Sequence, residues 1–405
     1  MHLLFVTSWV PYPPKGAKAR EFHFLRHLAR RHRVTCFCLL PPHEDPSGAE
    51  SLRRLGIEVH LISKRTAPLA RLAASFRMWI AGHVSDCAEY FEPRLFAALS
   101  RAAAADAADP VDAVQMQGSL FAPYLEAIPL ALRPRVHLDE HNVATTVCAS
   151  LASLPVPPLV SRAMRRRAAR MHKWEAAAVG KFGAVSVASR HDAEWVCNFA
   201  GGVPVHLIPN GVAPREIQLL PQRADSRRLV FAGPMGYHPN AYGAVWFCDA
   251  VLPLLRKRFS RISVDLVGPA PTAAVRALTS HPGVRVVDVD ATADLVSFYD
   301  DAAVAIVPLL ASGGNQPEIL EAMARGRAVV ATHAGCERLE VKDGEHLLIG
   351  DEPESFAAHV AALLEDVTTR ESLAARARAF VAANHDWDAL GVRLVSHIEA
   401  LATQP

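Results

Sequence analysis

Short apolar runs alternate with longer segments of helical periodicity from one end of the chain to the other. Runs such as 3–7, 34–39 and 229–232 have the length of a strand and are almost wholly apolar. Such runs are typical of strands buried on both faces of a parallel sheet. Segments such as 159–179 and 241–257 place apolar residues at helical spacing. The alternation predicts an α/β fold in which helices connect the strands of a parallel sheet.

This alternating pattern runs through the chain twice. A Pro-Asn-Gly turn and a polar, proline-bearing segment separate two halves of similar length, and 405 residues exceed one ordinary domain. We therefore expect two doubly wound, Rossmann-like domains that face each other across a cleft. The expected parts are an N-terminal domain at 1–208, a linker at 209–227, a C-terminal domain at 228–385, and a helix at 386–405 that returns towards the N-terminal domain.

The stretch 304–332 is the clearest single unit of this pattern. An apolar run ends at Pro308, a loop with Gly313 and Gly314 follows, and Pro317 stands where a helix would begin. Strand, glycine loop, helix and second strand form a βαβ unit, and such sheets bind ligands beyond the carboxyl ends of their strands. The loop offers backbone amides at a helix N-terminus, which suits a phosphate.

Two glutamates follow this loop at helical spacing. Glu318 and Glu321 are three residues apart, so they share one face of the predicted helix. Beside a bound phosphate, a carboxylate can accept hydrogen bonds from the two vicinal hydroxyls of a ribose. The same carboxylates can also do no more than complement the helix dipole. The stretch by itself leaves both interpretations open.

Composition limits the class of protein. Half of the residues are apolar and a fifth are charged, so a large core is available and disorder is not expected. Seven cysteines show no metal-ligand spacing, and Cys36 and Cys38 alternate along one predicted strand. We expect reduced, buried thiols in a cytoplasmic protein. The N-terminal residues lack the basic start and the long apolar run of a signal peptide or membrane span.

The charge is distributed unevenly. The formal net charge is +2, but residues 1–200 hold 25 Lys and Arg against 17 Asp and Glu, whereas residues 201–405 hold 18 against 24. The basic N-terminal half is therefore the part expected to meet an anionic acceptor or surface.

Several common kinds of ligand site are absent from the sequence. No G-x-G-x-x-G follows the first predicted strand, and the chain contains no P-loop. Asp288 and Asp290 have the spacing of a metal-bound diphosphate site but alternate with valines along a predicted strand. We expect no metal, no cofactor and no nucleic-acid partner.

The predicted helix at 159–179 is basic on most of its surface. Met164, Ala168, Met171 and Trp174 form an apolar stripe. The remaining surface carries Arg162, Arg165, Arg166, Arg167, Arg170 and Lys173. Such a helix fits an anionic lipid surface, although the solvated face of a packed helix has the same pattern. The segment 71–80, RLAASFRMWI, is in the same way either a surface that contacts acceptor or membrane, or core.

The sequence resembles a known enzyme family. SGGNQPEILEAMARGRAVVATHAGCERL is similar to the donor-site signature of family-4 retaining glycosyltransferases of the GT-B fold. FVTSWVPYPPKGAKAREFHFLRHLARRHRV, HLIPNGV and LVFAGPMGYHPNAYGAVWF extend the likeness to the sugar transferases of bacterial exopolysaccharide gene clusters. The resemblance implies a nucleoside-diphosphate sugar held mainly by the C-terminal domain, an acceptor held mainly by the N-terminal domain, retention at the anomeric carbon, and no metal requirement.

The resemblance also implies roles for individual residues. Glu321 falls on the glutamate that binds the ribose hydroxyls. The remaining positions fall on the loops that enclose the diphosphate, sugar and base: Lys15 and Gly16 after the first strand, Gly233 and Gly268 after two strands of the C-terminal half, and Gly313, Gly314 and Asn315 in the glycine loop.

Two positions depart from the family pattern. Gly313 stands where many relatives have a glutamate, and Glu318 stands where many have a lysine. The cations common after the strand that ends at Ala232 are also missing, so Lys15, Arg190, His238 or helix amides must meet the diphosphate charge. Glu318 is expected to turn away from the diphosphate, to pair with a base such as Arg325 or Arg327, or to take over a donor hydroxyl as a catalytic residue.

The sequence thus predicts an enzyme that moves a sugar from a nucleoside diphosphate to a hydroxyl of a glycan or a polyprenyl-linked glycan. His141, in Asp-Glu-His-Asn after a predicted strand, is either a catalytic residue at the donor sugar or acceptor, or a hydrogen-bonded loop residue. The alternatives are a sugar-nucleotide epimerase or hydrolase of the same fold, and a catalytically silent partner that binds a nucleotide sugar. We expect the protein to be cytoplasmic and to bind the inner membrane reversibly, as a peripheral protein, through the basic helix.

Overall fold

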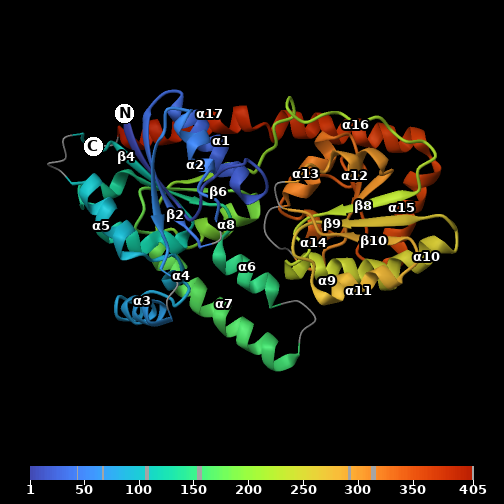
Figure 1. Ribbon diagram of the computed structural model, residues 1–405, viewed down its shortest axis with the longest axis horizontal. Coiled ribbons are helices and arrows are strands. Elements are labelled where there is room, and N and C mark those ends of the chain that lie inside the picture. The colour runs from blue at the N-terminus through green and yellow to red at the C-terminus, as the bar shows by residue number, and fades with distance from the viewer. Residues whose placement is uncertain are drawn as a thin grey trace. The chain divides into compact units, whose positions relative to one another are not determined.

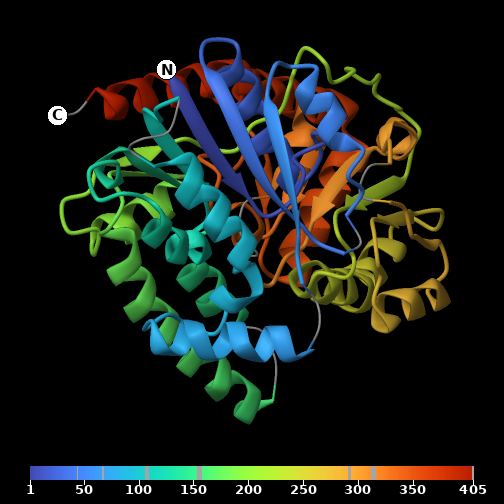
Figure 2. The ribbon, with the colours of Figure 1, turned by 60° about the vertical axis from the view of Figure 1, so that its left-hand side comes forward.

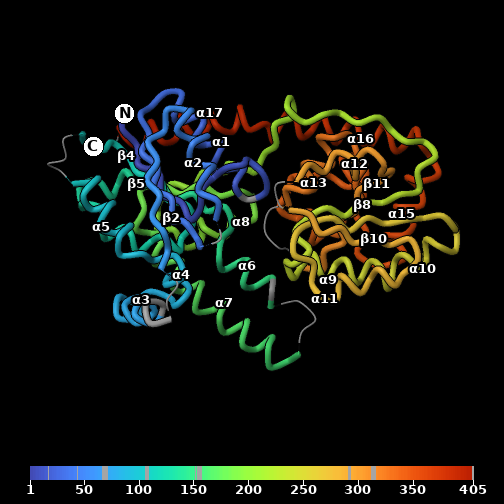
Figure 3. Tube along the Cα trace, viewed as in Figure 1, coloured from blue at the N-terminus to red at the C-terminus, as the bar shows by residue number. Residues whose placement is uncertain are grey.

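The computed structural model describes residues 1–42, 44–65, 68–104, 109–152, 157–290, 293–311 and 316–403 (Figure 3). The chain forms two compact units. Unit 1 comprises Met1–Ala152, Pro158–Pro209 and Asp388–Pro405, and unit 2 comprises Asn210–Trp387.

Unit 1 contains a parallel sheet of seven strands in the order β3-β2-β1-β4-β5-β6-β7 (Figure 1). The first strand pairs with β2 on one side and β4 on the other, with Leu3 opposite Val34 and Ala113. The strands are β1 (His2–Thr7), β2 (Arg33–Leu40), β3 (Glu58–Ser63), β4 (Ala113–Gln117), β5 (Val136–Glu140), β6 (Ala184–Val187) and β7 (Val205–Leu207).

Helices connect these strands, as the alternating pattern predicts. They are α1 (Ala17–Ala29), α2 (Gly48–Arg53), α3 (Pro68–Ile80), α4 (Cys87–Tyr90), α5 (Pro93–Ala102), α6 (Ala144–Leu151), α7 (Pro158–Val179) and α8 (Arg190–Cys197). Two 3-10 segments, Ser119–Ala127 and Arg133–Arg135, lie between β4 and β5.

The two faces of the unit 1 sheet differ in character. Leu4, Met116 and Leu138 belong to a core that also takes in Met171 and Trp174 of α7. The opposite face carries a buried row of polar side chains, in which Gln115 lies opposite His137 and Asp139 opposite Ser186: Thr7, Gln115, His137, Asp139 and Ser186. Parallel strands are normally apolar on both faces, so this buried polar row is a departure from the usual pattern.

The C-terminal helix α17 (Trp387–Ala402) packs on α1 and β7. Asp388 lies 2.9 Å from the Arg26 guanidinium and 3.0 Å from the His27 imidazole. The rings of His397 and His206 stack with centroids 3.8 Å apart. Gly391 leaves no room for a side chain, because a Cβ there would lie 2.3 Å from the His27 ring. The last helix is thus held to unit 1 by charge pairs and close packing.

Unit 2 contains a parallel sheet of six strands in the order β10-β9-β8-β11-β12-β13. The four residues of β11 and the four of β12 are all buried, which explains why the sequence of these strands is continuously apolar. The strands are β8 (Arg228–Ala232), β9 (Ser263–Val267), β10 (Val284–Val287), β11 (Val304–Val307), β12 (Ala328–Ala331) and β13 (Leu348–Ile349).

The helices of unit 2 follow the same alternation. They are α9 (His238–Trp246), α10 (Leu252–Arg256), α11 (Ala273–Ala277), α12 (Val296–Asp301), α13 (Pro317–Ala324), α14 (His333–Cys336), α15 (Pro353–Glu365) and α16 (Val367–Asn384). A single helix was expected at 241–257, but a π-helical turn, Phe247–Val251, divides it. Pro253 has no N–H to donate to the preceding turn, which accounts for the break.

Most cysteines are buried, but not all of them. The thiols of Cys36 and Cys38 lie on one face of β2 with their sulfurs 3.6 Å apart. Cys148 is half-buried and Cys197 is exposed. The expectation of buried thiols throughout was therefore wrong for these two residues.

Candidate functional site

Two strands of unit 2 end in glycines that touch each other. Gly233 follows β8 and donates its N–H to Val267 O at 2.9 Å, and Gly268 follows β9 and donates to Val287 O at 3.0 Å. A Cβ at Gly268, where φ is +157°, would lie only 1.8 Å from the Gly233 carbonyl oxygen. Only glycine fits there, so the backbones of the two strand ends are in direct contact.

Glu318, in the first turn of α13, lies directly against this glycine pair. A Cβ at Gly233 would meet Glu318 Oε1 at 3.1 Å and Asn240 Nδ2 at 2.8 Å. The other carboxyl oxygen, Oε2, is buried and has no hydrogen-bond partner among the residues that the structure describes. Burial, reinforced by the nearby negative charge of Glu321, raises the pKa of Glu318 to about 7. A buried oxygen without a partner costs free energy unless a ligand or a proton satisfies it.

Glu321 has a different environment on the same helix. Its Oε1 accepts hydrogen bonds from Arg325 Nε at 3.0 Å and Nη2 at 2.8 Å. Arg325 thus pairs with Glu321, not with Glu318 as expected. Arg327, the other expected partner, is buried and donates to the carbonyl oxygens of Ala302, Leu220 and Pro221. Both predicted pairings of Glu318 were wrong. Glu321 lies one helical turn before Arg325 and pairs with it, and Arg327 is buried in the core.

The other predicted donor-binding residues of unit 2 have varied settings. Gly313, Gly314 and Asn315 lie outside the residues that the structure describes. His238 is exposed at the first position of α9, where its ring lies 6.5 Å from that of Tyr242. An exposed imidazole at a helix N-terminus can reach an anion together with the helix amides.

A buried cation, Arg338, was missed by the sequence analysis. Burial raises the pKa of the Tyr237 hydroxyl, the positive charge of Arg338 lowers it, and the negative charge of Glu318 raises it. Arg338 and Glu318 therefore both lie within electrostatic range of one hydroxyl. Nothing in the local sequence distinguishes Arg338 from other arginines, because its importance depends on residues about 20 and 100 positions away.

In unit 1, the loop after β1 leads into α1 through Gly16. This residue has φ +55° and ψ −135°, a conformation that is open only to glycine at low cost. No atom lies within 4 Å of the position of a Cβ at Gly16, so the backbone conformation rather than space requires glycine. Gly16 and the preceding Lys15 are both exposed, which leaves the N-terminus of α1 accessible to a ligand.

A buried ion pair fixes α1 to the end of β5. Arg20 donates from Nε to Asp139 Oδ2 at 2.8 Å and from Nη2 to Oδ1 at 2.6 Å. Ser186 donates to Asp139 Oδ1 at 2.5 Å, and Arg20 Nη1 donates to Ile208 O at 2.7 Å. The Arg20 charge helps to hold the pKa of Asp139 below its usual value against the effect of burial. The pair joins three parts of unit 1, which is a positioning role.

His141 follows directly after this pair. Burial lowers the pKa of its imidazole to about 4, the Arg20 charge lowers it further, and Asp139 and Asp192 act in the opposite direction. The ring is therefore neutral at physiological pH. A neutral imidazole can donate one hydrogen bond and accept another, but it adds no positive charge for a diphosphate.

Arg190 is the first residue of α8 and is exposed. Ser189 caps this helix by accepting a hydrogen bond from the Asp192 N–H at 3.0 Å, and its hydroxyl donates to Asp192 Oδ2 at 2.7 Å. Asp192 is fully buried and also accepts from Thr146 at 3.1 Å. The cap orients the helix N-terminus beside Arg190, an arrangement that can take an anion.

Within the described ranges, no three His, Cys, Asp or Glu side chains group closely enough to hold a metal ion. None of the helices that the structure describes combines the length and apolar character needed to cross a bilayer.

Comparison with known sequences identifies a domain in unit 2. The family model for Glycosyl transferases group 1 matches residues 226–366. An uncharacterized 44.6 kDa protein from the cps region of Klebsiella pneumoniae is 24% identical over 164 residues. That match covers 39% of this chain and 42% of the relative.

Comparison with solved structures covers almost the whole chain. Sucrose-phosphate synthase from Thermosynechococcus elongatus aligns with a TM-score of 0.72 at 16% identity, over 99% of both chains. Anabaena HepE in complex with UDP and glucose aligns with a TM-score of 0.68 at 16% identity, over 99% of this chain and 100% of that one. A glycosyltransferase from Rickettsia africae aligns with a TM-score of 0.62 at 12% identity, over 100% of this chain and 99% of that one. Residues 226–366 therefore match the group 1 glycosyl transferases, and the chain that carries this segment has the GT-B fold.

Proposed function

We propose that the protein transfers a sugar from a nucleoside-diphosphate sugar to a hydroxyl of a glycan or a lipid-linked glycan. The observation that carries this proposal is the contact of Gly233, Gly268 and Glu318 at the strand ends of unit 2, inside the segment that matches group 1 glycosyltransferases. In open parallel sheets this edge binds nucleotides. HepE, a structural neighbour, has been solved with UDP-glucose, so a uridine nucleotide is the first donor to test.

In this proposal, the donor lies along the strand ends of unit 2. Glu321 accepts hydrogen bonds from the ribose hydroxyls, held in position by Arg325. The glycine loop with Gly313, Gly314 and Asn315 contacts the diphosphate and sugar, as the family resemblance implies. His238 and the backbone amides at the start of α9 would bind the remaining diphosphate oxygens.

Glu318 takes the place of the missing glutamate at position 313. Its Oε1 lies against Gly233, and its buried Oε2 has no hydrogen-bond partner among the described residues, so a sugar hydroxyl would satisfy it. With a pKa of about 7, the carboxyl group is close to half-protonated at physiological pH, so it can accept from a hydroxyl or donate to a phosphate oxygen.

The acceptor is proposed to lie on unit 1, with neutral His141 aligning its hydroxyl and with Lys15, Gly16 and Arg190 meeting diphosphate oxygens. During transfer, the bond from the anomeric carbon to the diphosphate oxygen breaks and the acceptor oxygen bonds to that carbon. The proton of the acceptor hydroxyl passes to the leaving diphosphate. Retention and membership of family 4 are part of the proposal and come from the resemblance.

The place of work is proposed to be the cytoplasmic face of the inner membrane. The cps-region relative supports a polysaccharide or glycoconjugate pathway, in which a polyprenyl-linked acceptor would lie in the bilayer. On α7, three residues of the predicted apolar stripe, Ala168, Met171 and Trp174, are buried, and Met164 is half-buried. Its basic residues are all exposed, which supports reversible contact with anionic lipid: Arg162, Arg165, Arg166, Arg167, Arg170 and Lys173.

The test is a product assay with the full chain. UDP-, GDP- and ADP-sugars are incubated with and without a polyprenyl-diphosphate-linked sugar, and free nucleoside diphosphate and glycosylated acceptor are measured. Nucleotide release that depends on acceptor supports a transferase. Release without acceptor indicates an epimerase or hydrolase, and binding without release indicates a silent partner. Analysis of the product's anomeric configuration by NMR decides retention.

A further inference from the structure

Helix α3 exposes an apolar face to solvent. Leu72, Phe76, Trp79 and Ile80 are 66%, 61%, 72% and 66% exposed. Their spacing places them on one side of the helix, and the rings of Phe76 and Trp79 lie 6.0 Å apart at 29°. Only Met78 of this segment is buried among the described side chains. The interpretation of 71–80 as core was therefore wrong. Soluble monomers rarely expose a contiguous apolar patch of this kind, so the patch indicates a binding partner.

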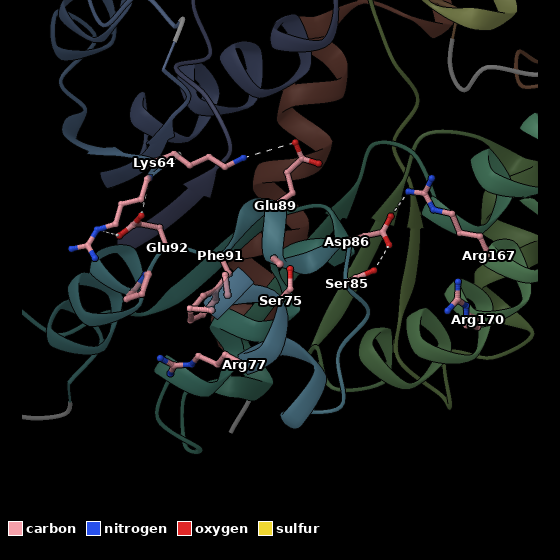
Figure 4. Close-up of a pocket in the computed structure, with 15 residues that line it drawn as sticks. Lys64, Ser75, Arg77, Ser85, Asp86, Glu89, Phe91, Glu92, Arg167 and Arg170 are labelled. Carbon is pink, nitrogen blue, oxygen red and sulfur yellow. Dashed lines mark hydrogen bonds and ion pairs between the residues drawn. The ribbon is translucent and has the colours of Figure 1, made fainter. Parts of the chain in front are cut away.

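A pocket of about 550 Å³ lies next to this helix, and its wall includes residues of α3, α4 and α7 (Figure 4). Figures 1 and 2 both place α3 beside α7. Three ion pairs occupy the wall: Lys64 with Glu89 at 3.8 Å, Arg65 with Glu92 at 3.8 Å, and Arg167 with Asp86. These pairs account for all three acidic residues that line the pocket.

Two further guanidinium groups line the same pocket without an acidic partner in the described ranges. Arg170 comes from α7, one helical turn after Arg167. Arg77 comes from α3, and its guanidinium carbon lies over the Phe91 ring at 4.9 Å. The pocket therefore carries an excess of two positive charges. Planar guanidinium groups bind phosphate oxygens in pairs, so the ligand that fits is an anion of the phosphate class.

Helix α3 contributes residues to both the apolar face and the cationic pocket. Leu159 at the start of α7 is also exposed, at 82%, and the exposed Arg162, Arg165 and Arg166 follow it. Aromatic and aliphatic side chains next to a dense group of arginines are the features of an element that lies in the interface of an anionic bilayer. A soluble sugar phosphate would need the cations but not the apolar face.

We infer that α3 inserts its apolar face into an anionic bilayer and that the pocket behind it, lined by Arg77 and Arg170, holds the phosphate of a membrane lipid. Leu72, Phe76, Trp79 and Ile80 lie among the acyl chains, while the phosphate enters the pocket from the membrane surface. This inference deepens the membrane contact of the proposed function and rests on it for the choice of a bilayer as partner. It is independent of the donor chemistry.

The experiment is vesicle flotation of the full chain with neutral phosphatidylcholine vesicles and with vesicles that contain one quarter phosphatidylglycerol. We expect binding to anionic vesicles that falls with added salt, because headgroup attraction is screened within about 8 Å at physiological ionic strength. Phe76→Ser/Trp79→Ser and Arg77→Gln/Arg170→Gln should each lower partitioning about 10-fold or more, since each apolar or basic group at the surface contributes separately.

Matched controls separate this surface from general effects. Leu130→Ser removes another exposed apolar residue of unit 1, 76% exposed, and Arg54→Gln/Arg101→Gln removes two exposed arginines outside the pocket. Neither should change partitioning by more than about 2-fold. Trp79→Phe should keep binding but remove most of the quenching of tryptophan fluorescence by brominated-acyl lipids.

Each outcome decides the inference. Three results would overturn the insertion of α3. They are equal recovery with neutral and anionic vesicles, control variants that bind vesicles as weakly as the α3 variants, and quenching that persists in Trp79→Phe. Unchanged binding of Arg77→Gln/Arg170→Gln would overturn the pocket as a lipid-phosphate site. Nucleotide release in solution, measured on the same variants, tests the transferase separately: vesicle binding without any release leaves this inference standing and refutes the proposed function.

Discussion

Replacing Glu318 by Gln should stabilise the protein at alkaline pH and leave its stability almost unchanged at acid pH. The pKa of Glu318 rises from 4.5 to about 7 in the folded state, chiefly through burial. A carboxyl group whose folded pKa lies above its unfolded pKa binds its proton more tightly when folded. The contribution of Glu318 to the free energy of unfolding is therefore fully present below pH 4.5 and is lost as pH rises towards 7. Glutamine cannot ionise, so the variant escapes this loss.

The magnitude follows from the two pKa values. One pKa unit corresponds to about 1.4 kcal/mol, so the rise from 4.5 to about 7 limits the effect at pH 8 to about 3 kcal/mol. Glu318 as a whole is only half-buried, and solvent lowers the value, so we expect about 1–3 kcal/mol. For a unit of this size, 1 kcal/mol changes the melting temperature by about 2–4 °C.

The assay is thermal unfolding of wild type and Glu318→Gln between pH 5 and pH 8, followed by circular dichroism. We expect the variant to melt at least about 3 °C above wild type at pH 8 and at nearly the same temperature at pH 5. Glu321→Gln is the matched control on the same helix. Its carboxylate accepts two hydrogen bonds from Arg325, so neutralising it should not stabilise the protein at pH 8. A difference for Glu318→Gln that stays constant with pH, or grows towards acid pH, would refute the reasoning.

Four further predictions concern binding, folding and pH dependence. Glu321→Ala should weaken donor binding about 10- to 100-fold in calorimetric titration, since hydrogen bonds to a charged group are worth about 1.5–3 kcal/mol; unchanged affinity would exclude the ribose role. Gly268→Ala should lower the urea midpoint sharply, because its Cβ would lie 1.8 Å from a backbone oxygen, and a stability equal to wild type would contradict that contact. Asp139→Asn should cost about 3–5 kcal/mol of unfolding free energy by leaving the buried Arg20 charge uncompensated, measured by urea titration. His141, with its pKa lowered to about 4, should give no inflection in kcat/KM between pH 5.5 and 9; His141→Ala should lower kcat without altering the shape of that profile.

Local patterns were sufficient to predict most of the secondary structure. The helix expected at 159–179 is α7, Pro158–Val179, because its apolar stripe repeats with the period of an α-helix. The run at 304–307 is β11, because a strand of a parallel sheet that is covered on both faces is continuously apolar. The order of these elements was enough to predict two doubly wound units, and the glycines at strand ends marked the edge at which Gly233 and Gly268 meet.

Tertiary structure decided which charges meet and which surfaces stay uncovered. Arg20 and Asp139 are 119 residues apart and form a buried pair, and no periodicity in either segment relates one to the other. The sequence placed Glu318 and Glu321 on one helical face, but their opposite environments depend on Gly233 from another strand and on Arg325 one turn away. The amphipathic pattern of α3 is also that of a core helix. Its apolar face is exposed because no described residue of unit 1 packs over it. Hydrophobic periodicity indicates which side of a helix is apolar but not what covers that side.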